Sequence, residues 1–187
     1  MTRSIAALVV GAAVLALPMP AASASPCPPA SAGGEPIGWI TVGDERVPIK
    51  PVDFTRSGAL DPPPSNRVAG ASVRHAPLAS STGTSVLTWH VRYGQGCPGR
   101  LNEILDLPIG STFDVETKDG RTTSYAITGR DVVRRGAHRA EWFDQEGPRR
   151  LSLFTCAGLV NGRYTKTLVV FAEPVLPEPS ATPGPIQ

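Results

Sequence analysis

The chain has 187 residues, enough for one compact domain of ordinary size but not for two full ones. Hydrophobic residues make up 41% and charged residues 18%, with 19 Gly and 20 Pro, which excludes a collagen-like repeat, a coiled coil and a chain that is disordered throughout. The net charge of +2 gives no electrostatic reason to expect a nucleic-acid partner.

The amino terminus, residues 1–24, has the features of a secretory signal peptide. Arg3 supplies the basic start, residues 5–17 are thirteen apolar or small residues, and Ala-Ser-Ala at 22–24 gives a small-x-small exit. This run is shorter than the roughly 20 apolar residues that a membrane-spanning helix needs. We therefore predict export with cleavage after Ala24, and we keep open an uncleaved anchor through residues 4–19.

Proline, alanine and serine dominate two further segments that cannot bury a core. Residues 25–36 are predicted to be a flexible lead-in, and residues 177–187 a disordered, Pro-rich tail. The folded domain is therefore predicted to span residues 37–176.

Within this domain the chain consists of short apolar stretches separated by turn residues. Residues 100–107 alone have the apolar spacing of a short helix, and Asp119-Gly120 predicts a hairpin turn. Strands are predicted at 38–42, 47–52, 85–91, 111–117, 122–133, 151–155 and 167–175. Many short strands with few helices predict a mostly β fold, either an antiparallel barrel or a sandwich.

The three cysteines are Cys27, Cys97 and Cys156. Export would place them in an oxidising compartment, where an odd number cannot pair completely within one molecule. At least one cysteine is therefore free, paired to another chain or kept for chemistry.

Two side chains that could perform chemistry follow predicted strands. His90 precedes a glycine-rich loop, and Cys156 comes directly after the strand at 151–155. A thiol needs a nearby base or cation to become a thiolate, and His90 and Arg163 could supply these. The alternative is that Cys156 is a small buried hydrophobe and His90 a structural residue.

Both candidates lie in segments that resemble one known family. Residues 83–91, Gly-Thr-Ser-Val-Leu-Thr-Trp-His-Val, are similar to the histidine region of sortases, and residues 151–158, Leu-Ser-Leu-Phe-Thr-Cys-Ala-Gly, resemble their Leu-x-Leu-x-Thr-Cys signature. Residues 47–49 and 58–63 are similar to the amino-terminal strands and loop of class F, the actinobacterial type. The resemblance covers residues 37–175.

The resemblance implies a closed β-barrel of about eight strands with one or two short helices, and the activity of a cysteine transpeptidase or peptidase. Sortases cleave a Leu-Pro-x-Thr-Gly-like signal between Thr and Gly through a thioacyl intermediate and pass the acyl group to an amine or to water. On this interpretation Cys156 is the nucleophile, His90 transfers protons, and Arg163 stabilises the oxyanion or positions the substrate carbonyl. Thr155, Trp89 and Ala157 are then expected to contact substrate.

Departures from the family pattern leave an alternative open. Trp89 stands where sortases usually have Gly, and Arg92 stands where class F often has Asp. After Cys156 the strand-aligned positions for the catalytic Arg of sortases are Thr165 and Thr167, which carry no charge, and Arg163 is the only Arg that follows the nucleophile. Trp89 and the register of this Arg favour a catalytically degenerate sortase fold that acts as a secreted binding module.

The remaining expectations concern partners, cofactors and the other two cysteines. The resemblance implies exported proteins with a sorting signal as substrates, a cell-wall or protein amine as acceptor, and action outside the cell or at its surface, and we expect a monomer. No cofactor or metal is expected, because the sequence has neither zinc-ligand spacing nor an acidic calcium loop. We further predict a disulfide between Cys27 and Cys97 that leaves Cys156 free.

Overall fold

The computed structural model describes residues 27, 34–56, 59–94 and 96–176, so the predicted signal peptide and the Pro-rich tail lie outside the described residues. The elements are β1 (Gly38–Val42), β2 (Glu45–Val52), β3 (Ala69–Ser72), β4 (Thr84–Thr88), β5 (Arg92–Tyr93), β6 (Cys97–Pro98), the 3-10 helix η1 (Asn102–Leu105), β7 (Thr112–Thr117), β8 (Thr122–Arg134), the 3-10 helix η2 (Ala140–Phe143), β9 (Arg150–Val160) and β10 (Arg163–Pro174). No helix in these ranges is long and apolar enough to cross a membrane.

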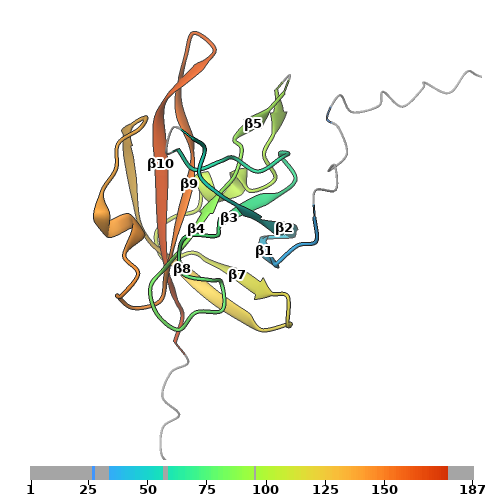
Figure 1. Ribbon diagram of the computed structural model, residues 1–187. Helices are drawn as coiled ribbons and strands as arrows, with labels where there is room; N and C mark the ends of the chain where they lie inside the picture. The colour runs from blue at the N-terminus through green and yellow to red at the C-terminus, as the bar shows by residue number, and fades with distance from the viewer. Residues whose placement is uncertain (1–26, 28–33, 57–58, 95, 177–187) are drawn as a thin grey trace, which may run out of the picture.

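Eight strands form a closed barrel in the order β1-β2-β3-β4-β9-β10-β8-β7, and β7 pairs back to β1 (Figure 1). This confirms the predicted mostly β fold and its closed barrel of about eight strands. The barrel is not entirely antiparallel, because β2 pairs with β3, and β4 with β9, in parallel. Parallel neighbours require a long crossover connection, which residues 53–68 and 89–149 provide.

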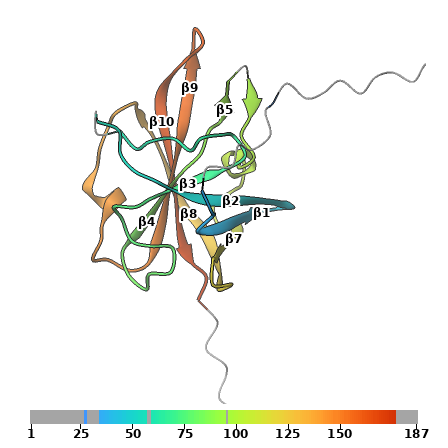
Figure 2. The same cartoon turned by 45° about the vertical axis from the view of Figure 1, so that its right-hand side comes forward.

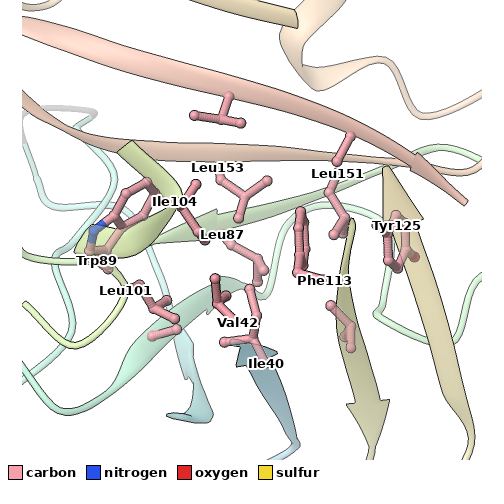
Figure 3. Packing of buried hydrophobic residues seen from close by; sticks show 14 of the residues in the cluster. Ile40, Val42, Leu87, Trp89, Leu101, Ile104, Phe113, Tyr125, Leu151 and Leu153 are labelled. Atoms are coloured by element: carbon pink, nitrogen blue, oxygen red, sulfur yellow. The ribbon is translucent and has the colours of Figure 1, made fainter. Parts of the chain in front are cut away.

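The barrel interior is filled by side chains that alternate along each strand. Ile40, Leu87, Phe113, Tyr125 and Leu153 are at most 3% exposed and meet in one cluster (Figure 3). Because successive residues of a strand point to opposite faces, the register of this cluster determines which side chains face outward.

Two strands are longer than predicted, and this changes the surroundings of Cys156. β9 continues to Val160 and β10 begins at Arg163, so the hairpin projects beyond the rest of the barrel (Figures 1 and 2). Asn161 and Gly162 form its turn with φ of 48° and 76°. Asn-Gly is the strongest short-range hairpin signal, so the sequence did contain the information for this turn.

The short strand β3 was not predicted because Ala-Gly-Ala-Ser contains no β-branched or aromatic residue. Its small residues fit between the neighbouring strands. A Cβ at Gly70 would approach side-chain atoms of Val52 and Thr88 to 2.8 Å and 3.0 Å.

The helix predicted at 100–107 is reduced to the single 3-10 turn η1. Arg130 of β8 donates to the carbonyls of Ile104 and Leu107, which satisfies acceptors that a short helix leaves free.

The second 3-10 turn, η2, packs outside the barrel. Trp142 is 1% exposed, its Nε1 donates to Asp131 of β8 at 3.2 Å, and its ring contacts that of Phe154. The connection between β8 and β9 therefore covers part of the outer face of β9.

Candidate active site

His90 follows the end of β4, and Cys156 lies on β9, the strand that pairs with β4 in parallel. The last residue pair of β4 and β9 is Thr88 with Phe154, and the Trp89 amide continues the ladder by donating to the Phe154 carbonyl at 3.2 Å. His90 lies two residues beyond Thr88, after β4 has ended, and Cys156 lies two residues beyond Phe154 within β9. The structure therefore places the predicted base and the predicted nucleophile beyond the same end of the β4–β9 pairing, and their roles stay predictions.

Both side chains point away from the barrel interior. Leu87 and Trp89 belong to the core cluster, as do Leu151 and Leu153, so strand alternation turns His90 and Cys156 to the outer face. Both are half-buried, and Cys156 is a free thiol. A half-buried thiol on the outer face is open to a substrate.

The expected substrate contacts lie on the core side of the barrel wall. Trp89 is 3% and Thr155 5% exposed, and Ala157 packs against the core cluster. Because successive residues of a strand face opposite sides, Thr155 and Ala157 point away from the face of Cys156, and the substrate contacts of all three residues stay predictions.

Thr155 has a different role, which is to connect the ends of the two strands. Its hydroxyl donates to the Trp89 carbonyl at 2.8 Å and is buried. Together with the hydrogen bond from the Trp89 N–H to the Phe154 carbonyl, this hydrogen bond fixes the backbone directly before His90 and Cys156.

Three neighbours hold His90 itself. Its Nε2 lies 2.8 Å from the carbonyl oxygen of the buried Pro63, and its ring meets the Tyr93 ring edge-on at 5.0 Å. Because a carbonyl oxygen only accepts, Nε2 carries a proton in this contact. Gly99 packs directly against the His90 backbone, so a Cβ at position 99 would collide with the His90 carbonyl oxygen.

The other two cysteines form a disulfide, with their Cα atoms 5.4 Å apart. Cys97 is 4% exposed, and its strand partner is Tyr93, the residue that contacts the His90 ring. The disulfide therefore attaches the lead-in at Cys27 to the hairpin beside His90.

The structure does not bring Arg163 to the thiol. Arg163 is exposed at the hairpin end of β10, where its partner is Val160, whereas the partner of Cys156 is Thr167. The four residue steps from Arg163 to Thr167 span about 13 Å at ~3.3 Å per residue. Among the described residues the Arg163 side chain makes no hydrogen bond or ion pair, and its oxyanion-stabilising role stays a prediction.

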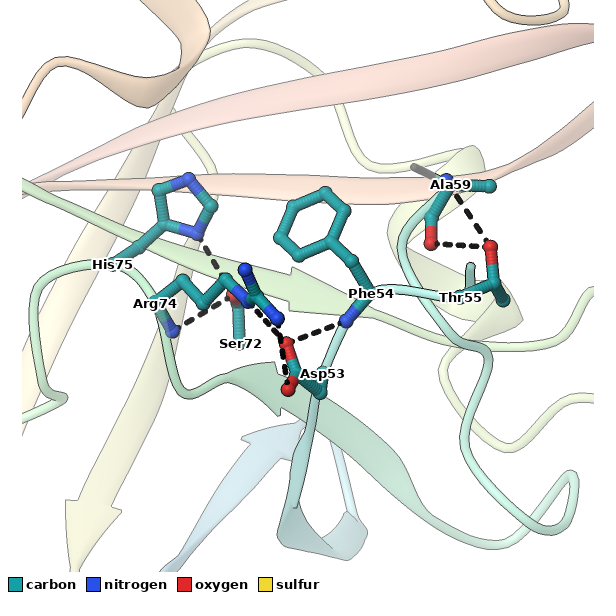
Figure 4. Close-up of polar contacts among 7 residues, drawn as sticks. All are labelled: Asp53, Phe54, Thr55, Ala59, Ser72, Arg74 and His75. Carbon is teal, nitrogen blue, oxygen red and sulfur yellow. Dashed lines mark hydrogen bonds and ion pairs between the residues drawn. The ribbon is translucent and has the colours of Figure 1, made fainter. Parts of the chain in front are cut away.

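An aromatic cluster borders the outer face beside Phe154. The Phe143 ring stacks on that of Phe154 at 5.3 Å and contacts His75 at 5.1 Å, while His75 contacts Phe54 at 5.7 Å. His75 also pairs with Ser72 through Nδ1 at 2.8 Å (Figure 4). These contacts join the connections after β2, β3 and β8.

An ion pair stabilises the start of the connection after β2. Arg74 pairs with the Asp53 carboxylate, which also accepts the Phe54 amide at 2.7 Å (Figure 4). The hydrogen bond from Arg74, with that of the amide, lowers the pKa of Asp53 below its ordinary value.

A cavity of about 420 Å³ lies apart from the His90 and Cys156 pair. It is largely apolar, between the connection after β3 and the β7–β8 turn, and its lining includes Leu78, Val86 and Lys118 but neither reactive residue. Within the described ranges, no three His, Cys, Asp or Glu side chains are placed to hold a metal ion.

Comparisons with known proteins agree with this barrel fold. A family model described as the sortase domain matches residues 55–175, while no curated protein matches the chain. Sortase A from Corynebacterium diphtheriae is similar in structure, with a TM-score of 0.61, 19% identity, and coverage of 80% of this chain and 65% of its own. Sortase C from Clostridium perfringens SM101 has a TM-score of 0.56 and 18% identity, with coverage of 76% of this chain and 71% of its own. Sortase C1 from Streptococcus suis has a TM-score of 0.57 and 20% identity, with coverage of 76% of this chain and 74% of its own.

These structural similarities show a shared fold, and the sortase family model matches more than half of the chain. The chain belongs to the sortase family. It spans just under two thirds of the length of the diphtheria sortase A chain.

Proposed function

We propose that this protein is a sortase-type cysteine transpeptidase that forms a thioacyl intermediate on Cys156. The observation that supports the proposal is the parallel β4–β9 pairing, continued by the Trp89 amide, because His90 and Cys156 each follow its last residue pair by two residues. Family membership supports it, because sortases are cysteine transpeptidases.

In the first step the Cys156 sulfur, as thiolate, attacks the carbonyl carbon of the scissile amide, and a carbon–sulfur bond forms. When the carbon–nitrogen bond breaks, the departing amine takes a proton from the His90 imidazolium. The Pro63 carbonyl accepts from Nε2, so the proton that leaves is the one on Nδ1.

In the second step an amine or water attacks the thioester. Neutral His90 removes a proton from this nucleophile through Nδ1, and the sulfur departs as thiolate. The two steps restore both side chains, so no cofactor enters the reaction.

The substrates that we propose are exported proteins with a Leu-Pro-x-Thr-Gly-like signal, cut between Thr and Gly. The acceptor is an amine of the cell wall or of a protein, with water as the alternative. We further propose that the protein belongs to class F, is exported, acts at the cell surface and is a monomer.

A second candidate function is binding without turnover by a degenerate sortase fold. The observation that favours it is the absence of a cation opposite Cys156, since Thr167 occupies that position.

The two functions can be separated by mass spectrometry of the purified protein with a library of Leu-Pro-x-Thr-Gly-like peptides. Transpeptidase function predicts an acyl adduct on Cys156, with loss of the adduct in Cys156→Ala and at least a tenfold slower adduct in His90→Ala. Thr41→Val is the control, because Thr41 is a half-buried threonine of β1, which neighbours neither β4 nor β9 in the barrel. Peptide binding without any adduct would contradict turnover and favour the binding module.

A further inference from the structure

Thr167 lies directly opposite Cys156 in the antiparallel β9–β10 pair. Opposed residues of such a pair share one face, with Cβ atoms about 4.5–5.5 Å apart. Leu168 and Val170 point into the core cluster, so alternation turns Thr167 to the outer face with the thiol.

The hydroxyl of Thr167 has no hydrogen-bond partner among the described residues. By contrast, the hydroxyls of Thr155 and Thr165 donate to backbone carbonyls at 2.8 Å and 2.9 Å. The strand partner of Thr167 on β8 is Val133, which offers no acceptor through its side chain. Thr167 is half-buried, so its donor is both unused and accessible.

No cation of β10 competes for this position. Arg163 lies about 13 Å further along the strand, and Lys166, the residue before Thr167, points to the opposite face by alternation. A hydroxyl is therefore the donor that β10 presents beside the sulfur.

We propose that Thr167 is a catalytic residue whose hydroxyl donates a hydrogen bond to the oxyanion formed during acyl transfer at Cys156. This inference rests on the proposed thioacyl chemistry. As sulfur bonds to the acyl carbon, the carbonyl π electrons move to oxygen, and this oxygen accepts the hydrogen bond. When the electron pair returns, the bond to the leaving group breaks. The donor stays protonated throughout, so the step balances without a further reactant.

The test compares two reactions of the same thiol in the intact protein. Acylation by p-nitrophenyl acetate passes through an oxyanion, whereas alkylation by iodoacetamide displaces iodide without forming one. We expect Thr167→Val to slow acylation about 100-fold, the lower end for one oxyanion donor, and to leave alkylation within about twofold. Thr167→Ser keeps the hydroxyl and is expected to retain acylation. Thr41→Val, at a half-buried threonine of β1, is the structural control.

Each outcome bears on a different claim. Equal slowing of both reactions in Thr167→Val, or slowing of neither, overturns the oxyanion role, as does a loss of acylation in Arg163→Ala alone. If Thr167→Val shows the selective loss but no peptide acylates the wild-type protein, the Thr167 role stands and the transpeptidase proposal fails. If p-nitrophenyl acetate acylates wild-type Cys156 no faster than free cysteine, both proposals fail.

Discussion

At the scale of single residues, Thr155 connects the backbone before the two reactive positions. Its hydroxyl donates to the Trp89 carbonyl at 2.8 Å, at a site 5% exposed. Thr155→Val leaves that buried carbonyl without this donor, which costs about 1–3 kcal/mol. We expect urea denaturation to show a corresponding loss of unfolding free energy, together with slower alkylation of Cys156. Thr155→Ser should restore both, and a Thr155→Val protein as stable as wild type would contradict this role.

The sequence could predict the reactive pair but not its contacts. His90 and Cys156 stand in recognisable motifs, and motif order survives whatever the length of the strands. Trp89, Thr155 and Ala157 flank the two reactive residues in sequence, but neighbours in a strand face opposite sides, so adjacency in sequence alone does not predict a shared face. How far a side chain such as Arg163 lies from the thiol depends on where its strand begins.

At the scale of secondary-structure elements, the β9–β10 hairpin illustrates that dependence. With β9 ending at residue 155, Arg163 could fold back toward the thiol. With β9 continuing to Val160 and the turn at Asn161 and Gly162, Arg163 becomes the first residue of the returning strand. A two-residue turn at the Asn-Gly pair pairs Val160 with Arg163, and counting back along both strands then pairs Cys156 with Thr167. This pairing can therefore be predicted from the sequence alone.

The disulfide is the second device at this scale. It closes a loop with a sequence separation of 70 between Cys27 and Cys97. In the chain-entropy account such a loop stabilises the fold by about 4.4 kcal/mol. We expect the double variant Cys27→Ser, Cys97→Ser to lose this amount in chemical denaturation. Wild-type protein under reducing conditions should match the double variant, and unchanged stability in both would show that the bond constrains nothing.

At the scale of the whole molecule, the sequence predicted a barrel but not its pairing. A strand such as 38–42 can be predicted from the sequence, because its apolar residues alternate and give it one apolar face. The parallel contact of β4 with β9 joins segments separated by more than sixty residues, and no local pattern encodes which distant strand is the neighbour. That contact, on which the His90 and Cys156 site depends, required either the family motifs or the structure.

The acid stability of the molecule should depend on His75, which links three connections around the outer face. Burial, and then the charge of nearby His138, lowers the pKa of His75 below 6.5. Above that value the residue is neutral in both states. As the pH falls through it, the unfolded chain takes up the proton first, so the unfolding free energy decreases until the lower folded-state pKa is passed. We expect the urea midpoint to fall between about pH 7 and about pH 5, less steeply in His75→Gln. His138→Gln should reduce the slope only in part, because it removes the smaller cause and keeps the burial. An identical pH slope in His75→Gln and wild type would show that another group controls stability in this range.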